Sequence, residues 1–101
     1  MAALSKQQIY DQIIAHINKE GGSYSSWYVG IASDPKQRLF NDHQVPKENA
    51  WFIYREAYTA EDARVVEKYI LDNHHTDGGG GGGDSTTKFV YAYKKTVHTN
   101  P

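Results

Sequence analysis

Apolar residues recur along the chain at two spacings, and the first is that of a helix. Isoleucines fall every three to four residues between Ile9 and Ile17, which predicts an amphipathic helix as far as Asn18. Ser5 followed by Gln8 has the form of a capping box, in which each side chain bonds the backbone N–H of the other residue. The chain is therefore expected to open with a helix.

The second spacing is the period of two that is typical of a β-strand. In residues 26–32, large apolar side chains alternate with small or polar ones. Residues 50–58 and 89–93 are rich in the aromatic and β-branched residues that strands prefer. These three segments are predicted to be strands, whereas residues 41–49 show no periodicity and are predicted to be a loop.

Two further helices are predicted from their start signals. Asp34 can cap a helix whose first position is Pro35, with Gln37 completing the capping box. Thr59 can cap a third helix, which we expect to continue to Asn73. The elements then run helix, strand, helix, strand, helix, strand, which is the order of a small α/β (α+β) protein.

Glu67 stands out in the third predicted helix because it interrupts an apolar stripe. At 3.6 residues per turn, it falls on the same face as Ala60, Ala63, Ile70 and Leu71. A buried carboxylate is costly unless a cation, a metal or a hydrogen-bond donor accompanies it. The sequence therefore predicts a partner for Glu67.

The length and the charge of the chain limit what it can be. The 101 residues contain no internal repeat, and we expect a single domain over residues 1–101. The net charge of -1 gives no overall basic character of the kind that a dedicated nucleic-acid binder often has. Residues 1–84 carry eight cations and twelve acids, whereas the remainder carries only cations, namely Lys88, Lys94 and Lys95.

Cysteine usage and hydropathy indicate where the protein works. Without cysteine, the chain has neither a disulfide framework nor a thiolate zinc site, which is compatible with a reducing compartment. Apolar runs are all shorter than a membrane span, and the first ten residues lack the hydrophobic stretch of a signal peptide. We expect a cytoplasmic protein without a membrane partner.

Six consecutive glycines occupy residues 78–83. Glycine lets backbone N–H groups approach an anion closely, but a common phosphate loop also needs a following lysine and a helix, which this segment lacks. We therefore interpret the run as a flexible loop. A metal site is a further interpretation, for which the flanks offer Asp72, His74, His75, Asp77 and Asp84.

The order of three features along the chain resembles that of a known enzyme family. Tyr28-Val29-Gly30 ends a predicted strand, Arg38 follows ten residues later on a helix, and Glu67 lies in the third helix. This order is similar to the second signature tyrosine, the arginine and the glutamate of the GIY-YIG nuclease superfamily, over about residues 27–70. The resemblance implies a small domain with a central three-stranded antiparallel sheet, which hydrolyses nucleic-acid phosphodiester bonds with one divalent cation.

The resemblance also implies roles for individual residues. Glu67 would hold Mg²⁺ or Mn²⁺, because a hard cation binds carboxylate oxygen while it keeps several waters. Tyr28 would accept the proton of the attacking water, and the planar guanidinium of Arg38 would clamp the phosphate. His43 and Tyr24 are auxiliary candidates.

The partner that the resemblance implies is DNA. Candidate nucleic-acid contacts are cationic and lie in the second predicted helix and around the last strand: Lys36, Arg38, Lys88 and Lys94. The sequence lacks a recognition helix or a zinc finger that would specify a target.

One motif of the family is missing from its expected place. The first motif, GIY, should lie on a strand before Tyr28 and be joined to it by a turn, but a helix and the segment 21–26 stand there. A second hypothesis is therefore a catalytically degenerate module that binds DNA or a protein partner. Exposed aromatic residues of the second and third strands would then form its contact surface, namely Tyr54, Tyr91 and Tyr93.

Overall fold

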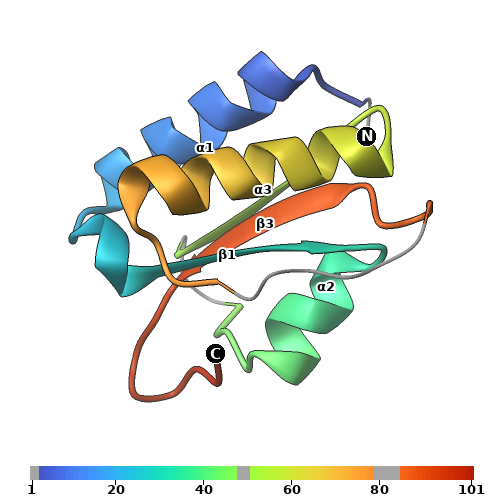
Figure 1. The fold of residues 1–101 in the computed structure, drawn as a ribbon. Helices are drawn as coiled ribbons and strands as arrows, with labels where there is room; N and C mark the ends of the chain where they lie inside the picture. Colours follow the sequence, from blue (N-terminus) through green and yellow to red (C-terminus); the bar gives the residue numbers. More distant parts are fainter. Residues whose placement is uncertain (1–2, 48–50, 79–84) are drawn as a thin grey trace.

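The computed structural model describes residues 3–47, 51–78 and 85–101. All six predicted elements are present in the predicted order, with a short 3₁₀ turn before the first strand and a π-helical turn after the second helix (Figure 1). The elements are α1 (Lys6–Glu20), η1 (Tyr24–Ser26), β1 (Trp27–Ala32), α2 (Pro35–Gln37), η2 (Arg38–Asp42), β2 (Phe52–Glu56), α3 (Ala60–His74) and β3 (Phe89–Lys94).

The three strands form one antiparallel sheet in the order β1-β3-β2. The last strand of the chain is therefore the central strand, and it pairs with both of the others. On β1, Tyr28 lies opposite Tyr93, and Gly30 lies opposite Tyr91. The predicted α+β fold with a three-stranded antiparallel sheet is confirmed.

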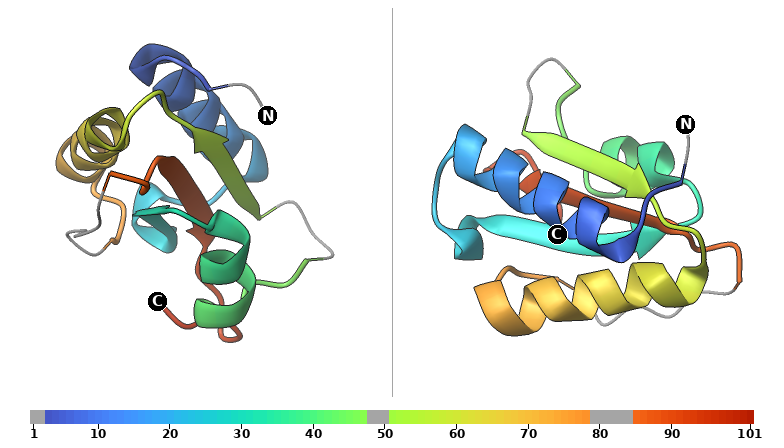
Figure 2. Two further views of the ribbon diagram at one scale, coloured as in Figure 1. Left: turned by 90° about the vertical axis from the view of Figure 1, so that its right-hand side faces the viewer. Right: turned by 90° about the horizontal axis from the view of Figure 1, so that it is seen from above.

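Helices cover both faces of the sheet. Figures 1 and 2 show α1 and α3 side by side on one face and α2 on the other. The α1/α3 face buries every second residue of β1, including Trp27 and Val29, against the isoleucines of α1. The α2 face buries Leu39 against Tyr91 and Tyr93 of β3. Successive residues of a strand point to opposite faces, so Tyr91 and Tyr93 share the face on which Tyr28 lies.

The predicted capping box of α1 is present. The Ser5 side chain accepts a hydrogen bond from the backbone N–H of Gln8, and the Gln8 side chain accepts one from the Ser5 N–H. The helix ends at Glu20, two residues later than predicted, because the N–H of Gly21 still bonds the carbonyl of Ile17. Gly21 ends the helix with φ of 88°, a backbone angle that glycine adopts readily.

The second helix begins as predicted but ends later. The Asp34 side chain accepts a hydrogen bond from the N–H of Gln37, and Pro35 takes the first helical position. The chain then continues into the π-helical turn η2, in which the N–H of His43 bonds the carbonyl of Arg38 at 2.8 Å. The prediction of a loop from residue 41 is therefore wrong for Asn41 and Asp42, which are helical.

Helix α3 places Glu67 where the sequence analysis expected it. Thr59 caps the helix, and Glu67 is only 5% exposed on a buried face that it shares with Ala60, Ala63, Val66 and Ile70. Apart from Gly78, the predicted glycine loop lies outside the described residues, and so does Asp84. Within the described ranges, each helix is too short or too polar to cross a membrane.

Candidate active site

Gly30 of β1 leaves the space that the phenol of Tyr91 fills. A Cβ atom on Gly30 would lie 2.5 Å from the Tyr91 hydroxyl oxygen and 2.6 Å from the ring carbon that carries it. Glycine in a strand often marks such a close approach by another group. The glycine of the Tyr28-Val29-Gly30 segment therefore admits a side chain from the neighbouring strand.

His43 connects the two buried tyrosines of β3. Its Nε2 atom lies 2.8 Å from the hydroxyl oxygen of Tyr91, and its Nδ1 atom lies 3.0 Å from that of Tyr93. The same Nδ1 atom lies 2.8 Å from the backbone carbonyl oxygen of Asn100. The backbone N–H of Asn100 in turn bonds the carbonyl of His43 at 2.7 Å, so the chain after β3 holds the imidazole from behind.

The Asn100 contact determines which nitrogen of His43 carries the hydrogen. A carbonyl oxygen only accepts hydrogen bonds, so the Nδ1 atom must donate to it. In the neutral imidazole, Nε2 is then the acceptor, and the O–H of Tyr91 donates to it. Burial favours the neutral ring and lowers the pKa of His43 below its usual 6.5, although the Asn100 hydrogen bond acts to raise this pKa.

Arg38 completes the surroundings of the Tyr91 hydroxyl. Its guanidinium lies close enough to the Tyr91 hydroxyl for each group to shift the pKa of the other. Its Nε atom also lies 3.5 Å from Asp42, in the helical ion pair that the four-residue spacing allows. Burial acts to lower the pKa of Arg38, but Tyr91 and Asp42 raise it, so the group is a permanent cation. The Arg38 side chain remains 48% exposed and can meet a ligand from solvent.

Burial is the main cause that raises the pKa of Tyr91 to about 12. The cation of Arg38 opposes this rise, whereas Tyr28 and Glu67 add to it. Burial also raises the pKa of Tyr93. Neither hydroxyl is therefore ionised in the resting protein near neutral pH.

Tyr28 packs against this group through its ring. Its ring centroid lies 5.2 Å from that of Tyr93, with the planes 22° apart, and 4.7 Å from that of His43. We call Tyr28, His43, Tyr91 and Tyr93 the phenol cluster. The description of Tyr91 and Tyr93 as exposed aromatic residues is wrong, because both are 0% exposed, and Tyr54 is partly buried. Central-strand residues are covered on both faces, which explains their burial.

Helix α3, which carries Glu67 on its buried face, packs on the α1/α3 face of the sheet, whereas the phenol cluster lies on the α2 face. The Glu67 carboxylate makes a polar interaction within the protein. The Oε2 atom itself is buried and accepts no hydrogen bond from the residues that the structure describes. Since the Glu67 charge contributes to the raised pKa of Tyr91, the carboxylate lies within electrostatic reach of the phenol cluster.

The residues around Glu67 fit a divalent cation only in one way. Groups of three or more His, Asp and Glu side chains that could hold a metal do not occur among the described residues. This part of the chain therefore offers no cage made of protein ligands alone. Mg²⁺, however, is commonly bound by one or two carboxylates together with substrate phosphates and waters. Glu67 fits that arrangement as the single protein carboxylate.

Other predicted site residues lie apart from the phenol cluster. Tyr24 donates a hydrogen bond to Asn18 at 2.9 Å and packs at the α1/α3 face, away from Tyr28. The ammonium of Lys94 lies over the ring of Trp51, 4.7 Å from its centroid. The remaining predicted nucleic-acid contacts are Lys88, Lys36 and Arg38. The structure places Lys36 in α2 and Arg38 two residues later, at the start of η2.

The flanks of the glycine loop contain ion pairs and hydrogen bonds within the protein. Asp77 pairs with Lys95 at 3.1 Å, and Asp72 pairs with Lys68 at 3.0 Å. His74 lies 2.6 Å from the hydroxyl of Tyr10. These partners, and the lack of a three-ligand group among the described residues, give no support to the alternative interpretation of this segment as a metal site.

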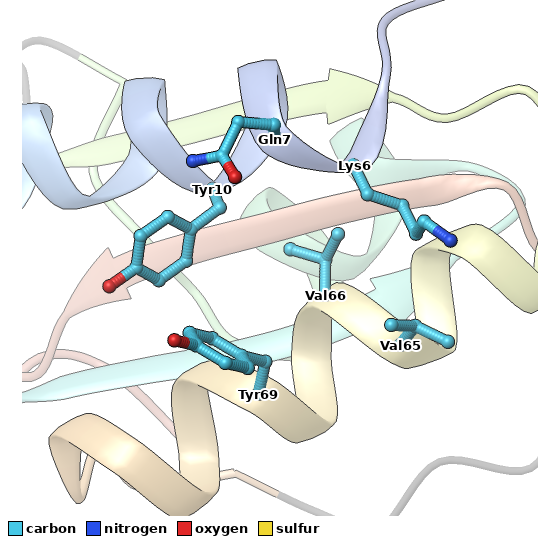
Figure 3. A pocket seen from close by; sticks show the side chains of 6 residues that line it. All are labelled: Lys6, Gln7, Tyr10, Val65, Val66 and Tyr69. Carbon is cyan, nitrogen blue, oxygen red and sulfur yellow. The ribbon is translucent and has the colours of Figure 1, made fainter.

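A groove lies between α1 and α3. It has a volume of about 250 Å³, and Figure 3 shows the side chains that line it: Lys6, Gln7, Tyr10, Val65, Val66 and Tyr69. It belongs to the helical layer on the face opposite the phenol cluster. Its lining is mainly apolar and aromatic, so it does not offer the acid and base groups of a hydrolytic site.

Comparisons with protein-family models, with curated proteins and with solved structures found no match to this chain. The functional inference therefore comes from its own residues. Sequence reasoning assigned Tyr28, Arg38 and His43, which the structure brings together, but it missed Tyr91 and Tyr93 as members of the same group. The signal that could have found them is the Tyr-Ala-Tyr pattern of the last strand. It could have been compared with the first motif that the sequence analysis did not find.

Proposed function

We propose that this protein is a divalent-cation-dependent endonuclease of the GIY-YIG type, in which β3 takes the place of the strand that carries the family's first motif. One observation supports this proposal above all. Tyr91 of β3 lies against Gly30, is hydrogen-bonded to His43 and lies within electrostatic reach of Arg38.

The strand that is missing in sequence has a counterpart in space. A first-motif strand joined to β1 by a turn would be its antiparallel neighbour. β3 is the antiparallel neighbour of β1, although it follows β1 by more than fifty residues in the chain. A signature tyrosine from β3 can therefore stand beside Tyr28 in the same sheet. The proposed enzyme is a rearranged version of the family pattern.

The phenol cluster provides a path for the proton of an attacking water. Tyr91 donates its hydrogen to Nε2 of neutral His43, and the cation of Arg38 lies within electrostatic reach of its oxygen. With a pKa of about 12, Tyr91 is not a standing phenolate. In the proposed reaction it takes a proton from water while it passes its own proton to His43. The lowered pKa of His43 keeps the imidazole ready to accept at neutral pH.

The charges needed for phosphoryl transfer come from two sides of this path. Arg38 has five N–H donors in a planar fork, which suits the oxygens of a phosphate. Glu67 would hold the cation, which when bound would neutralise charge on the scissile phosphate. We assign DNA as the substrate and the cytoplasm as the location, the latter because a chain without cysteine is compatible with a reducing compartment.

A nicking assay tests the proposal. Supercoiled plasmid incubated with the protein and Mg²⁺ or Mn²⁺ should be nicked or cleaved, and a chelator should stop the reaction. Arg38→Ala and Glu67→Ala should abolish the activity while the far-ultraviolet circular dichroism persists. Lys68→Ala is the matched control, since Lys68 is an exposed cation of α3 that pairs only along its own helix.

The burial of the phenols favours a second candidate function. Tyr91 and Tyr93 are 0% exposed and His43 is 5% exposed, so a phosphate reaches their hydroxyls only if the surroundings move. In the second candidate, the protein is a catalytically inactive module that binds DNA or a protein. If the wild type shows no turnover on duplex, branched or single-stranded DNA but still binds one of these partners, this second function replaces the first.

A further inference from the structure

A hollow on the outer side of α2 and η2 has no role in the reaction described above. Its volume is about 530 Å³, which is within the range of about 300–1,000 Å³ of small-molecule sites. The residues that line it are Asp34, Lys36, Gln37, Phe40, Asn41 and Lys47.

The lining combines positive charge with groups that can read a planar polar ligand. Lys36 and Lys47 bring two ammonium groups, and Gln37 and Asn41 bring two amides that both donate and accept. Asp34 is the single acid, and its carboxylate already accepts a hydrogen bond from the Gln37 N–H at 3.2 Å. The charge of the hollow is therefore positive, in a chain whose net charge is -1.

Phe40 gives the hollow an aromatic wall. It is partly buried and packs edge-to-face on Phe52, with the ring centroids 5.1 Å apart. The ammonium of Lys47 lies over the Phe40 ring, 5.1 Å from its centroid. A cation that lies over an aromatic face occupies the place where a nucleic-acid base can stack.

The hollow is continuous with the proposed active site through one helical segment. Arg38, whose exposed guanidinium would hold the scissile phosphate, lies between Gln37 and the Phe40–Asn41 pair in the chain. We propose that the hollow binds the nucleotide next to the scissile phosphate of a single-stranded nucleic acid. This inference rests on the proposed function, because it places the neighbouring phosphate at Arg38.

Each part of a nucleotide has a partner in this arrangement. The base stacks on Phe40 in place of the Lys47 ammonium, which moves to a backbone phosphate. Lys36 takes the phosphate on the other side, and the amides of Gln37 and Asn41 reach the edge of the base. An acidic peptide would use the lysines alone, so the aromatic ring and the two amides favour nucleic acid over protein.

Binding of a labelled oligonucleotide tests the inference without any cleavage. The probe is fluorescein-labelled oligothymidylate of about 12 nucleotides, measured by fluorescence anisotropy with chelator present. The Lys36→Ala/Lys47→Ala double variant should bind at least tenfold more weakly. The slope of the logarithm of its binding constant against the logarithm of the salt concentration should be about 1.4 less steep, since each lost phosphate contact on a single strand accounts for about 0.7. Phe40→Leu keeps an apolar side chain but removes the ring, and it should weaken binding about tenfold.

The matched control is Lys19→Ala/Lys68→Ala, which removes the same charge from the α1/α3 layer. Binding by this control should equal that of the wild type apart from a small salt effect. The inference is overturned if the wild type does not bind the probe. It is also overturned if the Lys36→Ala/Lys47→Ala variant binds the probe as tightly as the Lys19→Ala/Lys68→Ala control. It is also overturned if Phe40→Leu binds normally while polyglutamate competes with the probe, because the hollow is then only a basic patch.

Cleavage of the same oligonucleotide with Mn²⁺ separates this inference from the nuclease proposal. Weaker binding by the hollow variants, without any turnover by the wild type on this oligonucleotide or on supercoiled plasmid, would retain the nucleotide site and reject the enzyme. Turnover by the wild type with unchanged binding by the hollow variants would retain the enzyme and reject the nucleotide site.

Discussion

The hydroxyl of Tyr91 has a cation and a hydrogen-bond acceptor as neighbours. Arg38 interacts with it electrostatically, and Nε2 of His43 accepts its hydrogen. A buried neutral phenol in this position can take and release a proton without leaving its place. A tyrosine that only packs the core also needs a hydrogen-bond partner when it is buried, but proton transfer needs an acceptor such as the neutral imidazole of His43.

Tyr91→Phe removes the hydroxyl and keeps the ring against Gly30. We expect cleavage to fall by about 10²–10⁴-fold, the usual contribution of a positioned acid or base. The free energy of unfolding should fall by about 1–3 kcal/mol, because His43 loses a buried partner. Tyr54→Phe is the control, since Tyr54 pairs with Tyr91 across β2 and β3 but is only partly buried. Equal activity of both variants in the nicking assay would exclude Tyr91 from the reaction.

His43 should make the stability of the protein depend on pH. Burial lowers its pKa in the folded state, so between this value and about 6.5 the unfolded chain binds more protons. The free energy of unfolding therefore rises with pH through this window. The contribution of His43 to it is lost as the pH falls below about 6.5. Urea unfolding at about pH 7 and about pH 5 measures the change.

The control for this pH effect is the exposed residue His98. His43→Asn should show a smaller loss of stability between the two pH values than the wild type shows, whereas His98→Asn should behave as the wild type. Cleavage should respond with the same sign, because Nε2 accepts a proton only in the neutral ring. An unchanged pH dependence in His43→Asn would show that other groups control it.

At the scale of elements, the contact between β1 and β3 depends on the absence of a side chain at Gly30. Gly30→Ala places a Cβ atom 2.5 Å from the Tyr91 hydroxyl oxygen, so the phenol must move away from Arg38 and His43. We expect a loss of about 1–3 kcal/mol in the free energy of unfolding, typical of an overpacked core, and a loss of cleavage. Chemical denaturation and the nicking assay measure the two effects.

A double-mutant cycle shows whether the Tyr91 ring causes the Gly30 effect. In the Tyr91→Ala background the clash is absent, so adding Gly30→Ala should cost much less than it does in the wild type. Additive losses would mean that Gly30 is needed for a reason other than the close approach of Tyr91.

The starts of the helices could be predicted because their signals are local. Ser5, Asp34 and Thr59 each accept a hydrogen bond from an N–H three residues later, within one turn of chain. The central position of β3 has no such signal, because its partners in β1 lie about sixty residues away in the chain. Strand order is decided by which faces the helices cover, and this depends on tertiary packing.

The burial of Tyr91 and Tyr93 was missed for a related reason. A strand with one wet face shows alternation of polar and apolar residues, but four consecutive residues of β3 are buried because helices cover both faces. For tyrosines on such a strand, the sequence pattern does not distinguish a buried position from an exposed one. The sequence could place Glu67 on a buried stripe, since helical periodicity is strong over fifteen residues, but it could not show on which side of the sheet that stripe lies.

At the scale of the whole molecule, the proposed site has its groups on both faces of one thin sheet. Arg38 and the phenol cluster lie on the α2 face, and Glu67 lies on the α1/α3 face, with the edge strand β1 between them. Such a site works only if one ligand can reach both sides at the β1 edge. A divalent cation together with a phosphate group is a ligand of that kind, because the cation binds a carboxylate and the phosphate at the same time.

Mg²⁺ should therefore stabilise the folded protein through Glu67. A ligand that binds only the folded state at ten times its dissociation constant adds about 1.4 kcal/mol, which raises Tm by several degrees in a domain of this size. We expect this shift in thermal unfolding of the wild type, a larger one with oligothymidylate present, and none in Glu67→Gln. Asp72→Asn removes an exposed carboxylate of the same helix and should keep the shift. Equal shifts in both variants would place the cation elsewhere and leave Glu67 as a structural residue of the sheet–helix interface.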